Sequence, residues 1–311
     1  MRKKILIIKH GALGDIILAS KSLLAIRKQN QDALIVVLTT KPYLDLLAKS
    51  PWVDEVKIDL KPKWFNFIGV YKLIRWLINY NFDEVYDLQT SDRSGFYFYL
   101  IPRNKKPNWN GIVYGCSHRH VSSNRTTLHT LDRLAEQLNL SNLHSSYRVN
   151  WDWLRADLSK FNLPDNICLL VPGGSVHRKE KIWPGQRFAN LSKIVSNFGY
   201  NPVIIGGKNE KNIAMSIQSI NPSVINLVDK TSLAEVAQIS RLCKLAVGND
   251  TGPMHLINEC SSPRARIVVL FGSDSNPDLC APRGKKVKVL RRDSISDITV
   301  KSVISATNIA Q

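Results

Sequence analysis

A short loop, Asp250-Thr251-Gly252-Pro253-Met254-His255, carries the residue types in this chain that are best suited to chemistry. It follows the apolar run 245–247 and precedes a segment with a helical pattern. A strand that ends in Asp-Thr-Gly and turns into a helix presents a hydroxyl, free backbone N–H groups and the positive end of the helix dipole at one point. Phosphate groups bind at such points. We therefore expect this loop to hold a phosphate, although His255 alone also fits a packed core histidine.

Two further loops of this type follow apolar runs. One contains Gly173-Gly174-Ser175 and leads to Lys181-Ile182-Trp183-Pro184, and the other is His10-Gly11-Ala12-Leu13-Gly14-Asp15. Lys181 is suited to neutralise a phosphate as a point charge, but a lysine in the basic run 178–181 also fits a solvated surface. Three such loops in one chain indicate a substrate that carries a nucleotide.

Two carboxylates near these loops each allow two interpretations. Asp15 lies where a helix begins, so it suits a general base and equally a helix cap, since acidic residues favour the first turn. Glu210 follows the strand end Gly206-Gly207, where it suits a ribose or sugar hydroxyl and equally a first-turn carboxylate.

Several alternative chemistries lack their motifs. The loop 11–15 has no G-x-G-x-x-G spacing and no acidic residue closes the second strand, which argues against a nicotinamide cofactor. A P-loop, a G-x-S-x-G elbow and an Asp-x-Asp metal element are also missing from the sequence. We expect a diphosphate to be neutralised by Lys181 and helix N-termini, without a metal and without another cofactor.

The elements that must position these loops alternate along the chain. Short apolar runs that predict strands alternate with helical patterns, which indicates parallel sheets covered on both faces. The expected strands are 5–8, 33–38, 55–58, 84–88, 111–114, 166–171, 202–205, 224–227, 245–247, 267–271 and 287–290. The expected helices are 16–28, 43–49, 64–80, 128–138, 184–197, 210–220, 233–242, 254–260 and 299–306. Irregular sequence at 141–165 interrupts the pattern, so we predict two doubly wound α/β domains, 1–150 and 151–311.

Composition and charge narrow the class of protein. The 311 residues are 44% hydrophobic, with five scattered cysteines that favour free thiols in a reducing cytoplasm. We expect no membrane span, because no apolar stretch approaches ~18 residues.

The net charge of +18 is spread over both halves of the chain: residues 1–150 contain 22 basic and 12 acidic residues, and residues 151–311 contain 21 basic and 13 acidic residues. Such an even excess argues against nucleic acid and favours an anionic membrane face or a phosphorylated substrate, with plain solubility as the alternative.

Basic and aromatic residues are mixed at helical spacing between Lys61 and Tyr80. Lys61, Lys63, Lys72 and Arg75 alternate there with rings that include Trp64 and Trp76. The pattern suits a helix at a membrane interface and equally a helix whose aromatic side faces the domain core.

Together these residues resemble glycosyltransferase family 9, the ADP-heptose:lipopolysaccharide heptosyltransferases. The resemblance covers essentially the whole chain in order: Gly11-x-x-Gly14-Asp15, Gly174-Ser175 leading to Lys181-x-Trp183-Pro184, Gly206-Gly207 with Glu210, Asp250-Thr251-Gly252-x-x-His255, Leu270-Phe271-Gly272-Ser273, and Ile298-Thr299-Val300-x-x-Val303.

The resemblance implies a GT-B fold, with two Rossmann-like domains that face each other across a cleft. The N-terminal domain would handle the acceptor and the C-terminal domain the nucleotide sugar, in an inverting reaction that needs no metal. Asp15 would be the general base, and Lys181 would stabilise the departing diphosphate. The implied substrate-binding residues are Gly11, Gly14, Ser175, Glu210, Thr231, Asp250, Thr251, Gly252, Pro253, Met254 and His255.

The implied partners are ADP-heptose and an acidic lipid-linked saccharide of the lipopolysaccharide inner core. The protein would work in the cytoplasm, in peripheral contact with the inner membrane and without nucleic acid. A transferase of the same fold with another nucleotide sugar, or a sugar-nucleotide-binding protein that has lost catalysis, stays open as an alternative.

Overall fold

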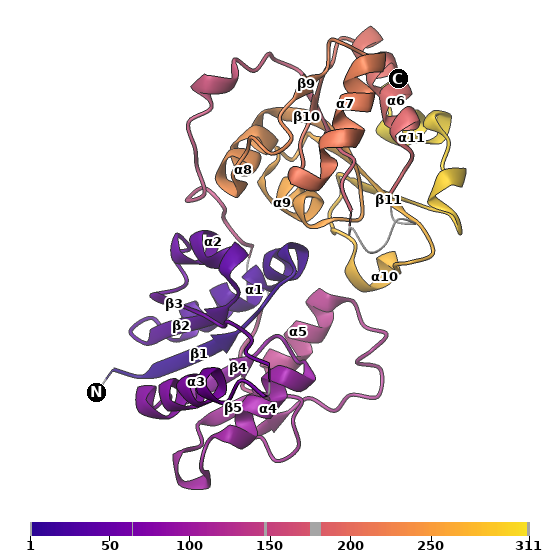
Figure 1. Cartoon of the computed structure of the whole chain (residues 1–311). Coiled ribbons are helices and arrows are strands. Elements are labelled where there is room, and N and C mark those ends of the chain that lie inside the picture. Colours follow the sequence, from indigo (N-terminus) through magenta and orange to yellow (C-terminus); the bar gives the residue numbers. More distant parts are fainter. Residues whose placement is uncertain (1, 64, 146–147, 175–181, 310–311) are drawn as a thin grey trace. The chain divides into compact units, whose positions relative to one another are not determined.

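The computed structural model describes residues 2–63, 65–145, 148–174 and 182–309, and it divides into two compact units (Figure 1). Unit 1 comprises Met1–Trp153 and unit 2 comprises Leu154–Gln311. The domain boundary expected after residue 150 lies close to this division.

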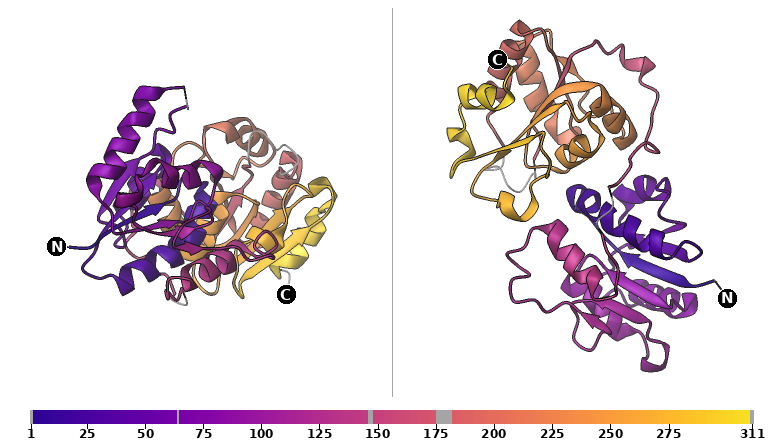
Figure 2. Two further views of the ribbon diagram at one scale, coloured as in Figure 1. Left: turned by 90° about the horizontal axis from the view of Figure 1, so that it is seen from below. Right: turned by 180° about the vertical axis from the view of Figure 1, so that it is seen from behind.

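Unit 1 is a parallel sheet of six strands with helices around it (Figure 2). The strand order is β3-β2-β1-β4-β5-β6. Strands β2 and β3 are added on one side of β1 and strands β4 to β6 on the other, so the order of strands reverses between β1 and β4, which we call the reversal point. The strands are β1 Lys4–Ile8, β2 Leu34–Thr39, β3 Glu55–Ile58, β4 Glu84–Asp87, β5 Asn108–Gly111 and β6 His118–Arg119. The helices are α1 Leu13–Gln29, α2 Leu44–Ala48, α3 Phe67–Tyr80, α4 Asp92–Leu100 and α5 Thr130–Asn139.

Unit 2 repeats the arrangement with the strand order β12-β11-β10-β7-β8-β9, all parallel, and reverses between β7 and β10. The strands are β7 Ile167–Val171, β8 Asn201–Ile204, β9 Ile225–Asn226, β10 Cys243–Asn249, β11 Arg266–Phe271 and β12 Val287–Arg291. The helices are α6 Gly185–Asn197, α7 Lys211–Ile220, α8 Leu233–Leu242, α9 Gly252–Cys260, α10 Pro277–Cys280 and α11 Val300–Thr307.

The central strands form the core of each unit. All four residues from Ile5 to Ile8 are fully buried, and so are all residues of β7 apart from a trace of exposure at Val171. A strand that is apolar on both faces is typical of a parallel sheet between two helical layers. The two-unit parallel α/β fold predicted from the sequence is therefore confirmed.

Local signals located some boundaries well and others poorly. Ser232 and Glu235 form a capping box at the start of α8, which the sequence places at residue 233, and Gly199 follows α6 with a positive φ of 79°. The strand expected at 111–114 was wrong by three residues, since β5 ends at Gly111, and the helix expected from residue 64 begins at Phe67. The helix α4 was missed altogether. No helix within the described part of the chain is long and apolar enough to cross a membrane.

Gly248 of β10 allows the closest approach between elements at the centre of unit 2. A Cβ atom there would lie 2.6 Å from the Met254 sulfur of α9 and 2.6 Å from Val171 Cβ of β7. We expect Gly248→Ala to lower the free energy of unfolding by about 1–3 kcal/mol, because the added methyl overpacks a dense core. Denaturant unfolding measures this.

Gly207→Ala is the matched control, because its Cβ would meet only a Glu210 carboxylate oxygen at 3.5 Å. Equal stability of the two variants would contradict the close packing at Gly248.

Candidate functional site

The loops singled out in the sequence lie at the two points where strand order reverses. The segment from Lys9 to Asp15 follows β1, residues 172–174 follow β7, and the loop beginning at Asp250 follows β10. Ligands of doubly wound sheets bind at the carboxyl ends of the strands at such points. Each unit therefore carries a candidate site at its own reversal point.

In unit 2, the buried Asn249 side chain holds two of these loops together. Its Nδ2 donates to the carbonyl oxygens of Pro172 at 2.8 Å and Gly173 at 3.2 Å. Its Oδ1 accepts the backbone N–H of Trp183 at 3.1 Å. One amide at the end of β10 thus fixes the glycine loop after β7 and the start of the Trp183-Pro184 turn.

Glu210 lies among three glycines from two neighbouring strand ends. Its carboxylate accepts the backbone N–H of Gly207 at 2.7 Å. A Cβ on Gly173 or Gly206 would lie 3.1 Å or 3.0 Å from Glu210 atoms, so both backbones approach the side chain closely. Burial raises the pKa of Glu210 above its ordinary value. The structure thus joins Gly173, Gly206, Gly207 and Glu210 in one cluster.

The loop Asp250 to His255 forms the start of α9, as the sequence predicts. Thr251 is the N-cap residue with extended backbone, Gly252 begins the helix, and Pro253 occupies its first turn. The Asp250 carboxylate accepts the Ser275 hydroxyl at 2.6 Å. Met254 and His255 are buried. The N-terminal backbone N–H groups of α9 offer an anion site, while Met254 contributes to packing beside Gly248.

Three other residues were predicted for the site of unit 2. Ser175 and Lys181 lie outside the described residues. Thr231 is half-buried and directly precedes Ser232, the N-cap of α8.

In unit 1, Asp15 lies in the first turn of α1. Its Oδ2 accepts the backbone N–H of Ala12 at 3.0 Å, which is the capping interaction that the sequence left open. The Tyr43 ring covers Gly11, where a Cβ would lie 2.3 Å from the ring. Gly11 has a φ of 121°, so glycine is required there on both counts. Burial, followed by the charge of Asp15, raises the pKa of Tyr43.

Lys9 and Asp87 form a buried charged centre at the ends of β1 and β4. The Lys9 ammonium donates to the Leu88 carbonyl oxygen at 3.1 Å. Burial lowers the pKa of Lys9 although the negative charges of Asp15 and Asp87 act to raise it. Burial raises the pKa of Asp87 to about 6, despite backbone N–H bonds from Thr90 and Gln89.

Arg125 presents hydrogen-bond donors to the same region. Its Nε and Nη2 atoms are buried and have no hydrogen-bond acceptor among the described residues. Burial and the nearby positive charge of Arg133 lower the pKa of this guanidinium. Buried N–H donors without acceptors are uncommon and suit the planar oxygens of a carboxylate or phosphate.

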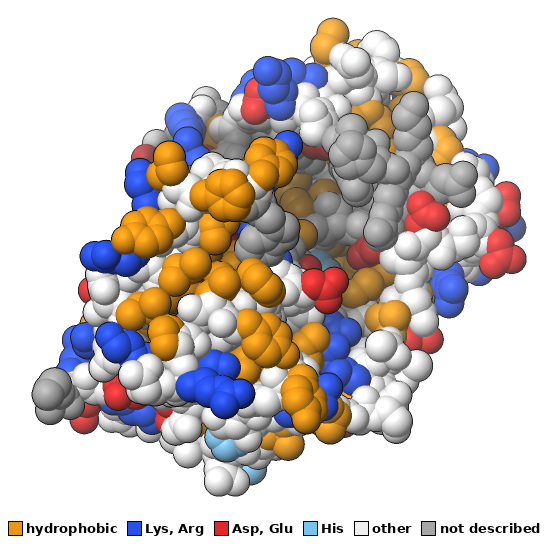
Figure 3. All heavy atoms as spheres, turned by 60° about the horizontal axis from the view of Figure 1, so that its bottom comes forward, with side chains coloured by type: hydrophobic (Ala, Val, Ile, Leu, Met, Phe, Trp, Pro, Cys, Tyr) orange, Lys and Arg blue, Asp and Glu red, His pale blue; other side chains and the backbone are white. Residues whose placement is uncertain are grey.

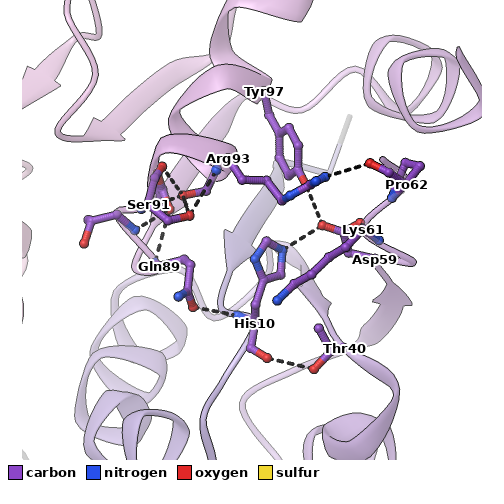
Figure 4. Close-up of polar contacts among 12 residues, drawn as sticks. His10, Thr40, Asp59, Lys61, Pro62, Gln89, Ser91, Arg93 and Tyr97 are labelled. Atoms are coloured by element: carbon purple, nitrogen blue, oxygen red, sulfur yellow. Dashed lines mark hydrogen bonds and ion pairs between the residues drawn. The ribbon is translucent and has the colours of Figure 1, made fainter. Parts of the chain in front are cut away.

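A second buried network joins the ends of β1 and β3 to α4 (Figure 4). His10 Nε2 lies 2.9 Å from Asp59 Oδ2, and the Tyr97 hydroxyl donates to the same oxygen at 2.5 Å. The Lys61 backbone N–H donates to Asp59 Oδ1 at 2.7 Å. These bonds outweigh the burial of Asp59 and hold its pKa below the ordinary value.

The sequence singled out Asp15 and the glycines of unit 1 but missed the Lys9–Asp87 centre, Arg125 and the His10–Asp59–Tyr97 network. The only sequence signal for Lys9, His10 and Asp59 was their position just after a strand, and Tyr97 and Arg125 had none, because the bonded partners lie 38 to 79 residues apart.

The parallel doubly wound sheets and the loops at their reversal points define the class of fold, two Rossmann-like α/β units with a candidate ligand site in each. The model of glycosyltransferase family 9 (heptosyltransferase) matches residues 70–307, so the chain belongs to that family.

Relatives with similarity over nearly the whole chain agree with this membership. Lipopolysaccharide heptosyltransferase 1 of Campylobacter coli is 23% identical, over 96% of this chain and 95% of its own length. The glycosyl transferase family 9 structure from Veillonella parvula has a TM-score of 0.80 at 23% identity, covering 98% and 95% of the two chains. The E. coli heptosyltransferase WaaC with ADP has a TM-score of 0.75 at 19% identity, covering 97% and 98%.

One structural neighbour carries a metal. The E. coli transferase TibC, described as an iron-containing dodecamer, has a TM-score of 0.59 at 12% identity and covers 99% of this chain and 75% of that chain. In the described parts of this chain, no group of three or more His, Cys, Asp or Glu side chains is placed to hold a metal. The metal-free reaction expected from the sequence stays an expectation.

Asp59 gives a prediction about stability and pH. Its pKa is lowered in the folded state, so it stabilises the fold above pH ~4 and this contribution is lost as the pH falls through the folded pKa. We expect Asp59→Asn to lower the free energy of unfolding at pH 7 by about 3–5 kcal/mol, because one partner of a buried pair is removed. Denaturant unfolding between pH 3 and 7 measures the difference, which should shrink in acid.

Asp32→Asn, at an exposed position, is the control and should leave stability unchanged across the same range. A difference for Asp59→Asn that stays constant with pH would contradict the role of its charge.

Proposed function

We propose that this glycosyltransferase moves a heptose from ADP-heptose to the inner core of lipopolysaccharide, onto an acceptor of the lipid A–Kdo type. The observation that carries the proposal is family membership together with lipopolysaccharide heptosyltransferase relatives of nearly full length. The solved relative with ADP supports an ADP-linked donor. The proposed reaction inverts the anomeric centre and uses no metal.

Asp15 is proposed as the general base. It takes the proton of the acceptor hydroxyl while that oxygen attacks the anomeric carbon, and the bond between the sugar and the diphosphate breaks so that ADP leaves with the electron pair. The cap to Ala12 does not conflict with this role, because a carboxylate has two oxygens and the hydrogen bond fixes its direction. A positioned base contributes about 10²–10⁴-fold to the rate.

The donor is proposed to bind at the reversal point of unit 2. The first-turn N–H groups of α9 and Lys181 would stabilise the charge on the departing diphosphate. Asp250 and His255 would shape that loop, Glu210 would lie near a sugar or ribose hydroxyl, and Thr231 near the adenine. The close approach of Gly173 and Gly206 to Glu210 supports this arrangement, since the two glycines leave room for the Glu210 carboxylate at these strand ends.

We propose that an acidic acceptor binds near two arginines of unit 1, Arg125 and Arg133. Arg125 holds buried donors without an acceptor of their own, and Arg133 is close enough to affect its pKa. The net charge of +18 favours an anionic lipid-linked substrate, and we propose that the protein works in peripheral contact with the cytoplasmic face of the inner membrane. Nucleic acid is not part of this proposal.

Thermal shift with nucleotides tests the donor. We expect ADP and ADP-heptose to raise the melting temperature more than UDP, GDP or their sugars do, because a ligand that binds only the folded state stabilises it in proportion to its affinity. A larger rise of the melting temperature with UDP or GDP would contradict the ADP-heptose assignment and would leave the family membership unchanged.

Substitution of Asp15 tests the base. We expect Asp15→Asn to lower kcat by about 10²–10⁴-fold, because the amide keeps the cap but accepts no proton. The measurement is transfer from ADP-heptose, with ADP binding followed in parallel and expected to be unchanged.

Asp45→Asn is the matched control, since Asp45 is an exposed carboxylate in the first turn of α2. Normal turnover of the Asp15 variant would show that Asp15 is a cap and not the base.

A further inference from the structure

Unit 1 exposes a group of large apolar side chains that a folded core would normally bury. Figure 3 shows apolar side chains gathered on one side of the molecule, with lysine and arginine among and around them. We call the following residues the aromatic face. Its members, with their exposed fractions, are Leu60 85%, Phe65 73%, Phe67 79%, Ile68 71%, Tyr71 57%, Phe96 42%, Tyr99 53% and Tyr114 75%. We propose that the aromatic face binds the headgroup region of an anionic lipid bilayer.

The helix α3 divides its apolar residues between two environments. Leu77 is buried, and Leu73, Trp76 and Tyr80 pack against the core of unit 1. Phe67 and Ile68, at the N-terminal end of the same helix, are more than two-thirds exposed. The segment 61–80 thus contains both the core helix and the membrane helix that the sequence left as alternatives. Trp76 belongs to the core side, so it is not an anchor.

The second half of the aromatic face comes from α4 and the segment after β5. The Tyr99 hydroxyl donates to the Tyr114 carbonyl oxygen at 3.1 Å, which joins these two rings. The loop through Pro62 connects them to α3: Arg93 of α4 donates to the Pro62 carbonyl oxygen at 3.2 Å, and Pro62 Cβ lies 2.7 Å from where a Cβ on Gly69 of α3 would be. The face is therefore continuous across two helices.

The charges beside the aromatic face are mainly positive, although exposed Asp92 begins α4. Residues 61–80 contain four basic residues and no acidic residue, and residues 96–119 contain the same numbers. Several of these cations lie over rings of the face: Lys63 is 5.5 Å from the Phe65 ring, Arg75 is 5.7 Å from the Tyr71 ring and Arg119 is 5.3 Å from the Tyr114 ring. Long basic side chains that lie along aromatic rings keep their charge at the rim of an apolar surface.

This combination favours a bilayer over a protein partner. Phenylalanine and isoleucine enter the boundary between headgroups and acyl chains, tyrosine suits the same boundary, and each lysine or arginine near an anionic leaflet contributes about 1 kcal/mol. Protein interfaces are depleted of lysine relative to the rest of the surface. The absence of acidic residues from both segments matches a uniformly negative surface.

The aromatic face adjoins the buried network at the reversal point of unit 1. Leu60 and Lys61 directly follow Asp59, whose carboxylate binds the Lys61 N–H, and Arg93 and Tyr97 come from the helix that also carries Phe96 and Tyr99 (Figure 4). A lipid-linked acceptor held at the membrane would thus meet unit 1 beside its candidate site. In this respect the inference rests on the proposed function and adds the surface that makes the contact.

Vesicle co-sedimentation of the full chain tests the inference. We expect the wild-type protein to pellet with phosphatidylglycerol-containing vesicles and much less with phosphatidylcholine vesicles. The triple variant Phe67→Ser, Ile68→Ser, Tyr71→Ser should lower the partition coefficient at least about tenfold, because three exposed apolar side chains are lost. The variant Lys63→Gln, Lys72→Gln, Arg75→Gln should lower binding to anionic vesicles by about fivefold per residue.

Met215→Ser with Leu242→Ser is the control, because both side chains are exposed in unit 2, and it should pellet like the wild type. Circular dichroism and the thermal shift with ADP show that each variant is folded. Undiminished pelleting of the folded triple variant, or equal pelleting of the wild type with both kinds of vesicle, would overturn the inference. Self-association abolished by the triple variant, without vesicle binding, would assign the face to a second copy and would also overturn it.

Transfer from ADP-heptose to a detergent-solubilised acceptor separates this inference from the proposed function. A wild-type protein that binds vesicles through the aromatic face but transfers no heptose would refute the proposed function and leave the face in place. Normal transfer by a triple variant that no longer binds vesicles supports both.

Discussion

The reversal of strand order in each sheet is the constraint on which the candidate sites depend. Strands on the two sides of a reversal send their following helices in different directions, so the loops between them part and leave backbone groups without ladder partners. In unit 2, the Asn249 side chain supplies hydrogen bonds to three of these backbone groups. It donates to the carbonyl oxygens of Pro172 and Gly173 and accepts the N–H of Trp183. This buried amide joins residues 172 and 173 to Trp183 at the end of β10, the strand that leads into α9.

In unit 1, a charged side chain makes the hydrogen bonds at the corresponding reversal point between β1 and β4. The Lys9 ammonium occupies the reversal point by donating to Leu88, while the backbone N–H of His10 donates to the Gln89 side chain at 2.9 Å. Burying such groups costs free energy unless they are paired, and the opposed pKa shifts of Lys9 and Asp87 reflect that cost. Titratable groups perturbed in this way at a strand end are typical of functional sites.

The sequence predicts what local patterns encode. Apolar runs located the central strands, such as the expected 5–8 for β1 and 245–247 for β10. The helix α4 was missed because Gly95 and a run of aromatic residues obscure its periodicity, although Ser91 is an N-cap whose hydroxyl accepts the Ser94 N–H. The contacts of Asp59 with His10 and Tyr97 could not be predicted from one sequence, because each pair joins different elements and neither residue type requires the other.

The helix α3 shows why periodicity alone could not decide between core and interface. A helix that packs on the sheet at one end and extends past it at the other needs apolar residues along its whole length, so its pattern is the same in both environments. The difference is set by what lies opposite: Phe82 packs against Trp76, whereas Phe67 and Ile68 face no protein layer that covers them. The Lys61 backbone N–H binds Asp59 of the buried network, and Pro62 contacts both Arg93 of α4 and the Gly69 position of α3. The more of an apolar surface such contacts hold in place before it meets a partner, the less conformational entropy is lost when it binds.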